Sequence, residues 1–250
     1  EIINEQKYIE MKKNYEHQIK AFSQLLINLN CNIANKNKNN ETPLIYAIIR
    51  NNYFIAKEYF KIQNGFAQLN NDYYLNILEA VMNNGNATNE ECLELMDLIL
   101  SSKNKNNEMI FNKTILNKEI KGCLLTPIVW LCKNFGYNIY EKYNNLLKLK
   151  SIDYLIDNSS GNITINKLLD KNTLAEIKQK ALNELNNLIN KYLEPLLRKM
   201  ILLGSNIHYY EDKLKSGKTS AFMYLMKFPF IKNLSDFIEE NKINPDYRDY

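Results

Sequence analysis

The tripeptide Gly217-Lys218-Thr219 is the best candidate for chemistry in the chain, because phosphate-binding loops end in Gly-Lys-Ser/Thr. In such a loop the backbone surrounds the phosphates and the lysine neutralises their charge. The motif also requires a glycine five residues before Gly217, and that position is Asp212. The preceding residues do not have the pattern of a buried β-strand. We therefore predict that no nucleotide binds here.

Cysteine and histidine side chains are too few and too scattered to suggest a metal centre. A structural zinc site needs four such ligands, often in Cys-x-x-Cys spacing, and that spacing is absent. We predict no metal site and interpret the cysteines as reduced, small core residues. The residues concerned are Cys31, Cys92, Cys123, Cys132, His17 and His208.

Motifs for other catalytic chemistry are also missing. The sequence has no Gly-x-Ser-x-Gly turn for a serine nucleophile. The acidic pairs Glu90-Glu91 and Glu239-Glu240 are typical of solvated helix faces. We therefore predict that the chain is not an enzyme and uses no cofactor.

The composition is that of a globular protein of ordinary charge. Of the 250 residues 45% are hydrophobic, and 32 basic against 28 acidic side chains give a net charge of +4. This excess is too small to indicate a dedicated nucleic-acid-binding protein. No apolar stretch reaches the ~18–20 residues of a membrane span, and no apolar leader is present. We predict an intracellular, cytoplasmic protein without a membrane span.

Asparagine accounts for 40 of the residues, far above its usual share. Lysine, isoleucine and tyrosine are also frequent, a bias expected from coding DNA rich in A and T. Asparagine-rich stretches therefore carry little information by themselves. Because the sequence does not begin with Met, we also expect it to be a segment of a longer chain.

Residues 42–60 have the pattern of two short antiparallel helices. Thr42 can cap a helix that begins at Pro43, where the missing N–H of proline costs nothing. Apolar residues then follow at helical spacing, and Asn51-Asn52 provides a turn. A second apolar face extends to Phe60.

The stretch from Leu25 to Phe60 resembles the ankyrin repeat without a gap. The family pattern runs Leu-Leu-Leu-x-x-Gly-Ala-Asp-Ile-Asn, then a finger loop, then Thr-Pro-Leu-His-x-Ala. Here Ile45 replaces the His, while Asn30 and Asn40 stand at the glycine positions. Asparagine is a mild replacement for glycine, because it adopts positive φ more readily than other residues.

Looser copies follow, and Leu75–Ala80 lies 33 residues after Thr42–Ala47, which is the ankyrin period. Thr126–Leu131 and Gly217–Ala221 open further units. The resemblance implies an all-α solenoid of stacked antiparallel helix pairs with finger loops, forming one domain over residues 1–250. We expect a long finger at 101–125 and later helices at 90–100, 142–156, 173–191, 195–203 and 233–240. The six expected units lie near 1–33, 34–66, 67–101, 102–157, 158–207 and 208–250.

A solenoid of this family implies a protein–protein interaction scaffold that binds a partner protein through its concave face. The partner's identity is not implied, although the basic bias of the expected contact positions favours an acidic surface. Tyrosines on the fingers would add contact area at low entropic cost. The expected contact residues are Lys36, Lys38, Asn39, Glu41, Ile49, Arg50, Tyr209, Tyr210, Lys215, Ser216, Lys218, Met226 and Lys227.

Two other interpretations stay open. The chain could be a structural α-solenoid segment without its own ligand, in which only one unit happens to resemble ankyrin. It could also bind nucleic acid through basic rims and stacking tyrosines, which predicts salt-dependent binding to generic DNA or RNA.

Overall fold

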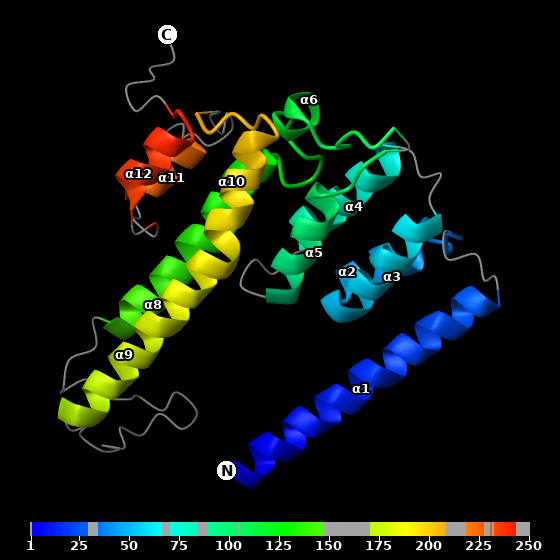
Figure 1. Ribbon diagram of the computed structural model, residues 1–250, viewed down its shortest axis with the longest axis horizontal. Helices are drawn as coiled ribbons and strands as arrows, with labels where there is room; N and C mark the ends of the chain where they lie inside the picture. The colour runs from blue at the N-terminus through cyan, green and yellow to red at the C-terminus, as the bar shows by residue number, and fades with distance from the viewer. Residues whose placement is uncertain are drawn as a thin grey trace. The chain divides into compact units, whose positions relative to one another are not determined.

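The structure, a computed structural model, describes residues 2–29, 35–66, 71–84, 90–104, 106–147, 171–208, 219–227, 231 and 233–243. These residues are predominantly helical and contain no β-strand, which confirms the all-α prediction (Figure 1). Two segments are π-helical, η1 (Leu131–Tyr137) and η2 (Ile189–Leu193). The α-helices are α1 (Ile2–Asn28), α2 (Pro43–Ile49), α3 (Tyr53–Phe66), α4 (Asn71–Asn84), α5 (Glu90–Leu100), α6 (Lys113–Leu116), α7 (Pro127–Trp130), α8 (Asn138–Leu147), α9 (Lys171–Leu188), α10 (Glu194–Leu202), α11 (Ala221–Lys227) and α12 (Leu234–Glu240).

The chain forms two compact units. The first comprises Glu1–Pro127 with Leu203–Ser205, and the second comprises Ile128–Leu202 with Asn206–Tyr250. The single repeat domain expected for residues 1–250 stays a prediction.

The core of the first unit is formed by two helix pairs, α2 with α3 and α4 with α5. α2 packs against α3 and α4, while α5 packs against α3 and α4. Residues 33 positions apart occupy equivalent places. Leu44 and Ile77 are fully buried, and the small residues Ala47 and Ala80 are buried as well. Small side chains at these two positions allow neighbouring helices to approach closely.

The start of α2 agrees with the sequence. The Thr42 hydroxyl accepts a hydrogen bond from the Ile45 N–H at 3.3 Å, and Pro43 is the first helical residue. Asn51 follows α2 with φ of 56°, a conformation that asparagine tolerates better than most residues. The predicted cap and turn are therefore confirmed, and α3 continues beyond Phe60 to Phe66.

Two hairpin turns in this unit have the same internal hydrogen bonds. In the first, Asn37 Oδ1 accepts from the N–H groups of Asn39 and Glu41, both at 2.9 Å. In the second, Asn104 Oδ1 accepts from the N–H groups two and four residues later, at 2.9 and 3.0 Å. Both asparagines also donate through Nδ2 to the glutamate four residues on. Each turn therefore satisfies its polar groups internally.

The two turns have the same hydrogen bonds because they have the same sequence. The hexapeptide Lys-Asn-Lys-Asn-Asn-Glu occurs at 36–41 and again at 103–108. Asn40 and Asn107, at the fifth position of each copy, have φ of 64° and 63°. The expected long finger at 101–125 was wrong in detail, because this segment contains the second turn, a bridge between Lys103 and Met109, and the short helix α6.

The second unit is built on two long helices. One runs without interruption through α7, η1 and α8, although its first residue, Pro127, belongs to the other unit. The other runs through α9, η2 and α10. α8 packs against α9, and α11 packs against η1. Arg198 of α10 donates to Glu194 on its own helix and to Glu240 of α12, which connects the last short helix to this pair.

Two expected helix breaks in this unit are not present. The sequence predicts a turn before a helix at 142–156, yet the chain is helical through residues 127–147, and residues 148–156 lie outside the described residues. It also predicts separate helices at 173–191 and 195–203, yet η2 joins them. Pro195 lies in the first turn of α10, directly after η2. A π-helical segment absorbs the local mismatch that a proline without an N–H creates, so the helix continues.

Replacing Asn37 by Ala is expected to destabilise the first unit by about 1–2 kcal/mol, because three side-chain hydrogen bonds of the turn are lost. Asn104→Ala should have a similar cost, since its network is the same. Urea unfolding followed by circular dichroism measures both. Asn39→Ala in the same turn is the control, expected within about 0.5 kcal/mol of wild type. Equal effects at Asn37 and Asn39 would contradict the role given to the Asn37 side chain.

Candidate binding groove

A groove of about 640 Å³ runs along the first unit between the first hairpin turn and α4. We call it the finger groove. One wall is the turn together with the start of α2, and the other wall is one face of α4. Its lining residues are Lys36, Asn39, Asn40, Glu41, Thr42, Ile45, Asp72, Tyr73, Asn76, Glu79, Ala80 and Asn83.

The helical period positions the α4 wall. Asp72, Asn76, Glu79 and Asn83 are spaced by three or four residues, so they lie on one side of the helix. The opposite side carries buried core residues such as Ile77. The same helix therefore supplies both a core face and a polar groove wall.

The end of the α4 wall that carries Asn83 is held in place by the turn at Lys121 and Gly122. The Asn83 Nδ2 donates to the carbonyl of Lys121 at 2.8 Å. Gly122 has φ of 100°, and a Cβ at this position would come within 2.4 Å of the Asn83 side chain. The backbone conformation thus favours glycine here, and a larger residue would also displace the Asn83 side chain.

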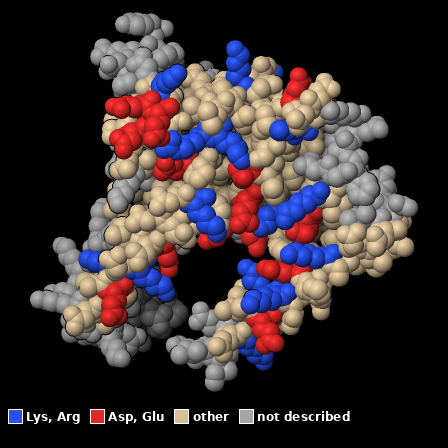
Figure 2. Space-filling view, viewed as in Figure 1, with Lys and Arg blue, Asp and Glu red and all other residues tan. Residues whose placement is uncertain are grey.

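The finger groove carries more negative than positive charge. Among its described lining residues Lys36 is the one cation, against Glu41, Asp72 and Glu79. Burial raises the pKa of the Tyr73 hydroxyl, so it stays neutral at physiological pH. The expectation of a basic rim therefore does not hold for this groove. On the face drawn in Figure 2, basic and acidic side chains are interspersed.

The structure brings together part of the expected contact set. Lys36, Asn39 and Glu41 line the finger groove, whereas the exposed Lys38 does not. Ile49 is half-buried and is not part of the lining. The Arg50 guanidinium lies 5.2 Å from the centre of the Tyr46 ring.

The other expected contact residues belong to the second unit. Met226 of α11 is 55% exposed, as expected. Lys227 ends α11, and its side chain is outside the described part of the structure. The following expected contacts lie outside the described residues altogether: Tyr209, Tyr210, Lys215, Ser216 and Lys218.

The polar face of α4 was missed at the level of the sequence. The helix itself was anticipated from the 33-residue spacing, but its exposed residues were not chosen as contacts. Asp72, Asn76, Glu79 and Asn83 repeat at helical spacing between the apolar residues, and this pattern was a usable signal.

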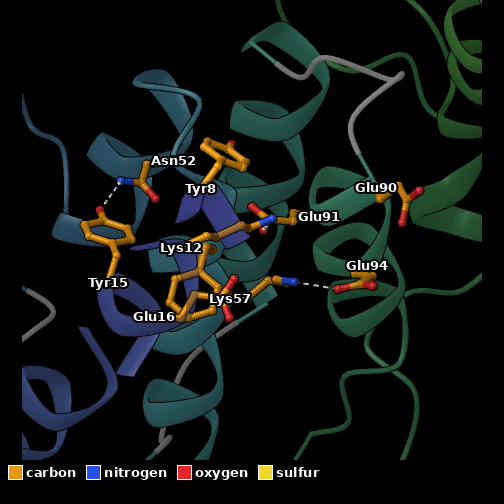
Figure 3. A pocket seen from close by; sticks show the side chains of 10 residues that line it. Tyr8, Lys12, Tyr15, Glu16, Asn52, Lys57, Glu90, Glu91 and Glu94 are labelled. Atoms are coloured by element: carbon orange, nitrogen blue, oxygen red, sulfur yellow. Dashed lines mark hydrogen bonds and ion pairs between the residues drawn. The ribbon is translucent and has the colours of Figure 1, made fainter. Parts of the chain in front are cut away.

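A second, polar groove of about 700 Å³ lies where α1 meets α3 and α5 (Figure 3). Lys12 of α1 forms an ion pair with Glu91 of α5 at 3.9 Å, and Lys57 of α3 pairs with Glu94 of α5. Asn52 donates to the Tyr15 hydroxyl at 3.3 Å. We interpret the Lys12 and Tyr15 contacts as the attachment of α1 to the helix pairs, because they join α1 to α5 and to the residue that precedes α3.

Cys92 and Cys132 are fully buried, as the sequence predicts for core residues. Burial raises the pKa of the Cys92 thiol to about 12 and raises that of Cys132 as well. Both thiols therefore stay protonated at neutral pH and lack the thiolate needed for nucleophilic or metal chemistry.

Within the described residues no group of three or more His, Cys, Asp or Glu side chains is arranged to hold a metal ion. In the same part of the chain, the helices fall short of the length and apolar character that a membrane crossing requires.

Comparison with known proteins adds no relative. No protein-family model matches this chain, and neither a curated protein nor a solved structure matches it.

Alkylation of the native protein is expected to discriminate among the cysteines. Burial raises the pKa of all three thiols, but Cys123 is half-exposed and should react with iodoacetamide at least about tenfold faster than the buried Cys92 and Cys132. Peptide mass spectrometry of samples quenched over time measures each rate. In urea the three rates should converge, which is the control for intrinsic reactivity. Fast native labelling of Cys132 would show that its surroundings are not closed.

Proposed function

We propose that the chain is a non-catalytic protein-binding module of ankyrin type, a solenoid of stacked helix pairs whose finger groove receives a segment of a partner protein. The observation that carries the proposal is the repetition of structure in the first unit. α2 and α4 pack side by side with equivalent buried residues 33 positions apart, which is the ankyrin repeat length.

The two hairpin turns support the same interpretation. The copies of the hexapeptide begin 67 residues apart, close to two repeat lengths, and have the same hydrogen bonds. In a repeat array each unit contributes one finger at a fixed place. A turn that recurs near a multiple of the period is what such an array produces.

The charge of the finger groove favours a basic partner segment. Asp72 and Glu79 of α4 face the groove from one side and Glu41 from the other. Lysine or arginine side chains of an extended peptide would complement this arrangement, whereas the phosphates of a nucleic acid would be repelled. The groove therefore argues against the nucleic-acid alternative at this surface.

An intracellular setting is part of the proposal. Cys123 and Cys132 form no disulfide, which suits a reducing compartment. The absence of a suitable membrane-spanning helix among the described residues is compatible with it. The cytoplasm is the simplest such location.

Selection from a random-peptide library displayed on phage tests this function. The recovered peptides should be rich in lysine and arginine. Asn76→Arg places a positive charge on the α4 wall and should weaken their affinity at least about tenfold, by like-charge repulsion. Asn187→Arg on α9 makes the same chemical change at an exposed site of the other unit and should leave affinity within about twofold. Binders that are insensitive to Asn76→Arg, or no binders at all, would reject the finger groove as the binding site.

A further inference from the structure

Helix α1 exposes a regular apolar stripe that the first unit uses only at Tyr8 and Tyr15, which line the polar groove against α3 and α5. Five large apolar side chains of this stripe, and Leu29 directly after the last residue of α1, are between 46% and 67% exposed. Their positions, together with Gln18, are spaced alternately by three and four residues. The α1 stripe comprises Tyr8, Met11, Tyr15, Gln18, Phe22, Leu25 and Leu29.

The side of α1 that packs on the first unit is a different one. α1 packs against α3, Ser23 is buried, and Ile19 and Leu26 are half-buried. At 100° per residue the centre of the α1 stripe lies about a quarter turn from this packed side. Tyr15 stands at the boundary, where its hydroxyl accepts the hydrogen bond from Asn52. Most of the α1 stripe is therefore open to a further partner.

The spacing of the α1 stripe is that of a coiled-coil seam. Alternating steps of three and four residues average 3.5, which keeps a seam facing a second helix over several turns. The stripe provides seven consecutive a and d positions, and Gln18 is the one polar residue among them. A single polar position is common in natural seams, because it specifies register.

The exposed area suits a second copy of the chain. Six side chains of roughly 200 Å² each, about half to two thirds exposed, leave about 700 Å² on each chain. A specific dimer buries about 800 Å² per partner, and the largest apolar patch on a monomer is often functional. An interface formed by the same stripe on both chains is closed by a twofold axis, the commonest symmetry of soluble oligomers.

Charge selects the direction of the two helices. In a parallel pair, Lys7 at a g position would face Lys12 at the following e position of the second copy, and these charges repel. In an antiparallel pair Lys7 instead faces Asn28. That arrangement also places Tyr8 opposite Leu25 and Met11 opposite Phe22, so that larger and smaller side chains alternate.

We propose that the chain forms a homodimer in which two copies of α1 pack antiparallel through the α1 stripe. This interface shares no residue with the finger groove, so it is independent of the proposed protein-binding function.

Sedimentation velocity of the full 250-residue chain tests the proposal. Between about 1 and 100 µM, wild type should shift from monomer to dimer, the range in which an interface of modest size dissociates. The double variant Met11→Glu/Phe22→Glu should raise the dimer dissociation constant at least about a hundredfold. Both residues are more than half exposed, so the variant should keep the circular dichroism of the wild-type fold. Wild type that stays monomeric throughout, or a folded double variant that still dimerises, would overturn the proposal.

Two further variants complete the experiment. Gln6→Glu/Lys13→Gln changes the net charge by the same amount on the far side of α1, and it should dimerise like wild type. Loss of its dimer would assign the interface to another surface. Lys7→Glu tests direction, because it would tighten a parallel dimer by turning repulsion into attraction, whereas an antiparallel dimer should change less than about threefold. A tenfold gain would reject the antiparallel arrangement.

Discussion

The first unit depends on the constraint that none of its helix pairs can bury an apolar side alone. α2 has only seven residues, far fewer than the ~12–15 that an isolated helix needs for stability in water. Its stability must come from packing against α3 and α4, with Leu44 and Ile48 fully buried. Because these contacts occupy one side of each helix, the polar side of α4 is left free to line a groove.

The hairpin turns show how an asparagine-rich sequence produces a defined surface. Asn37 uses its side-chain oxygen and nitrogen to satisfy groups that a flexible loop would leave to water. Asn40 supplies the positive φ that glycine usually provides. The turn thereby fixes Lys36 and Asn39 at the edge of the finger groove, and this preorganisation would lower the ordering cost of the binding that we propose.

Local sequence signals predicted the helix pair at 42–60 because Thr42, Pro43 and Asn51 act through short-range geometry. The uninterrupted helix at 127–147 could not be predicted in this way, because a π-helical turn lets the chain absorb an irregular pattern without a break. The finger groove was predicted on one wall only. Its α4 wall depends on which side of the helix the core takes, and that is decided by packing with α2 and α5.

Asn52 shows how α1 is attached through a polar atom at the edge of its apolar stripe, which leaves most of the stripe uncovered. Its Oδ1 accepts from the Ile55 N–H at 3.3 Å at the start of α3, and its Nδ2 donates to Tyr15 at the same distance. One short side chain therefore both caps a helix and holds α1 by a polar contact. Because polar contacts and a narrow packed side are sufficient for attachment, six apolar side chains remain in water. Their exposure has a free-energy cost, and the dimer that we propose would remove it.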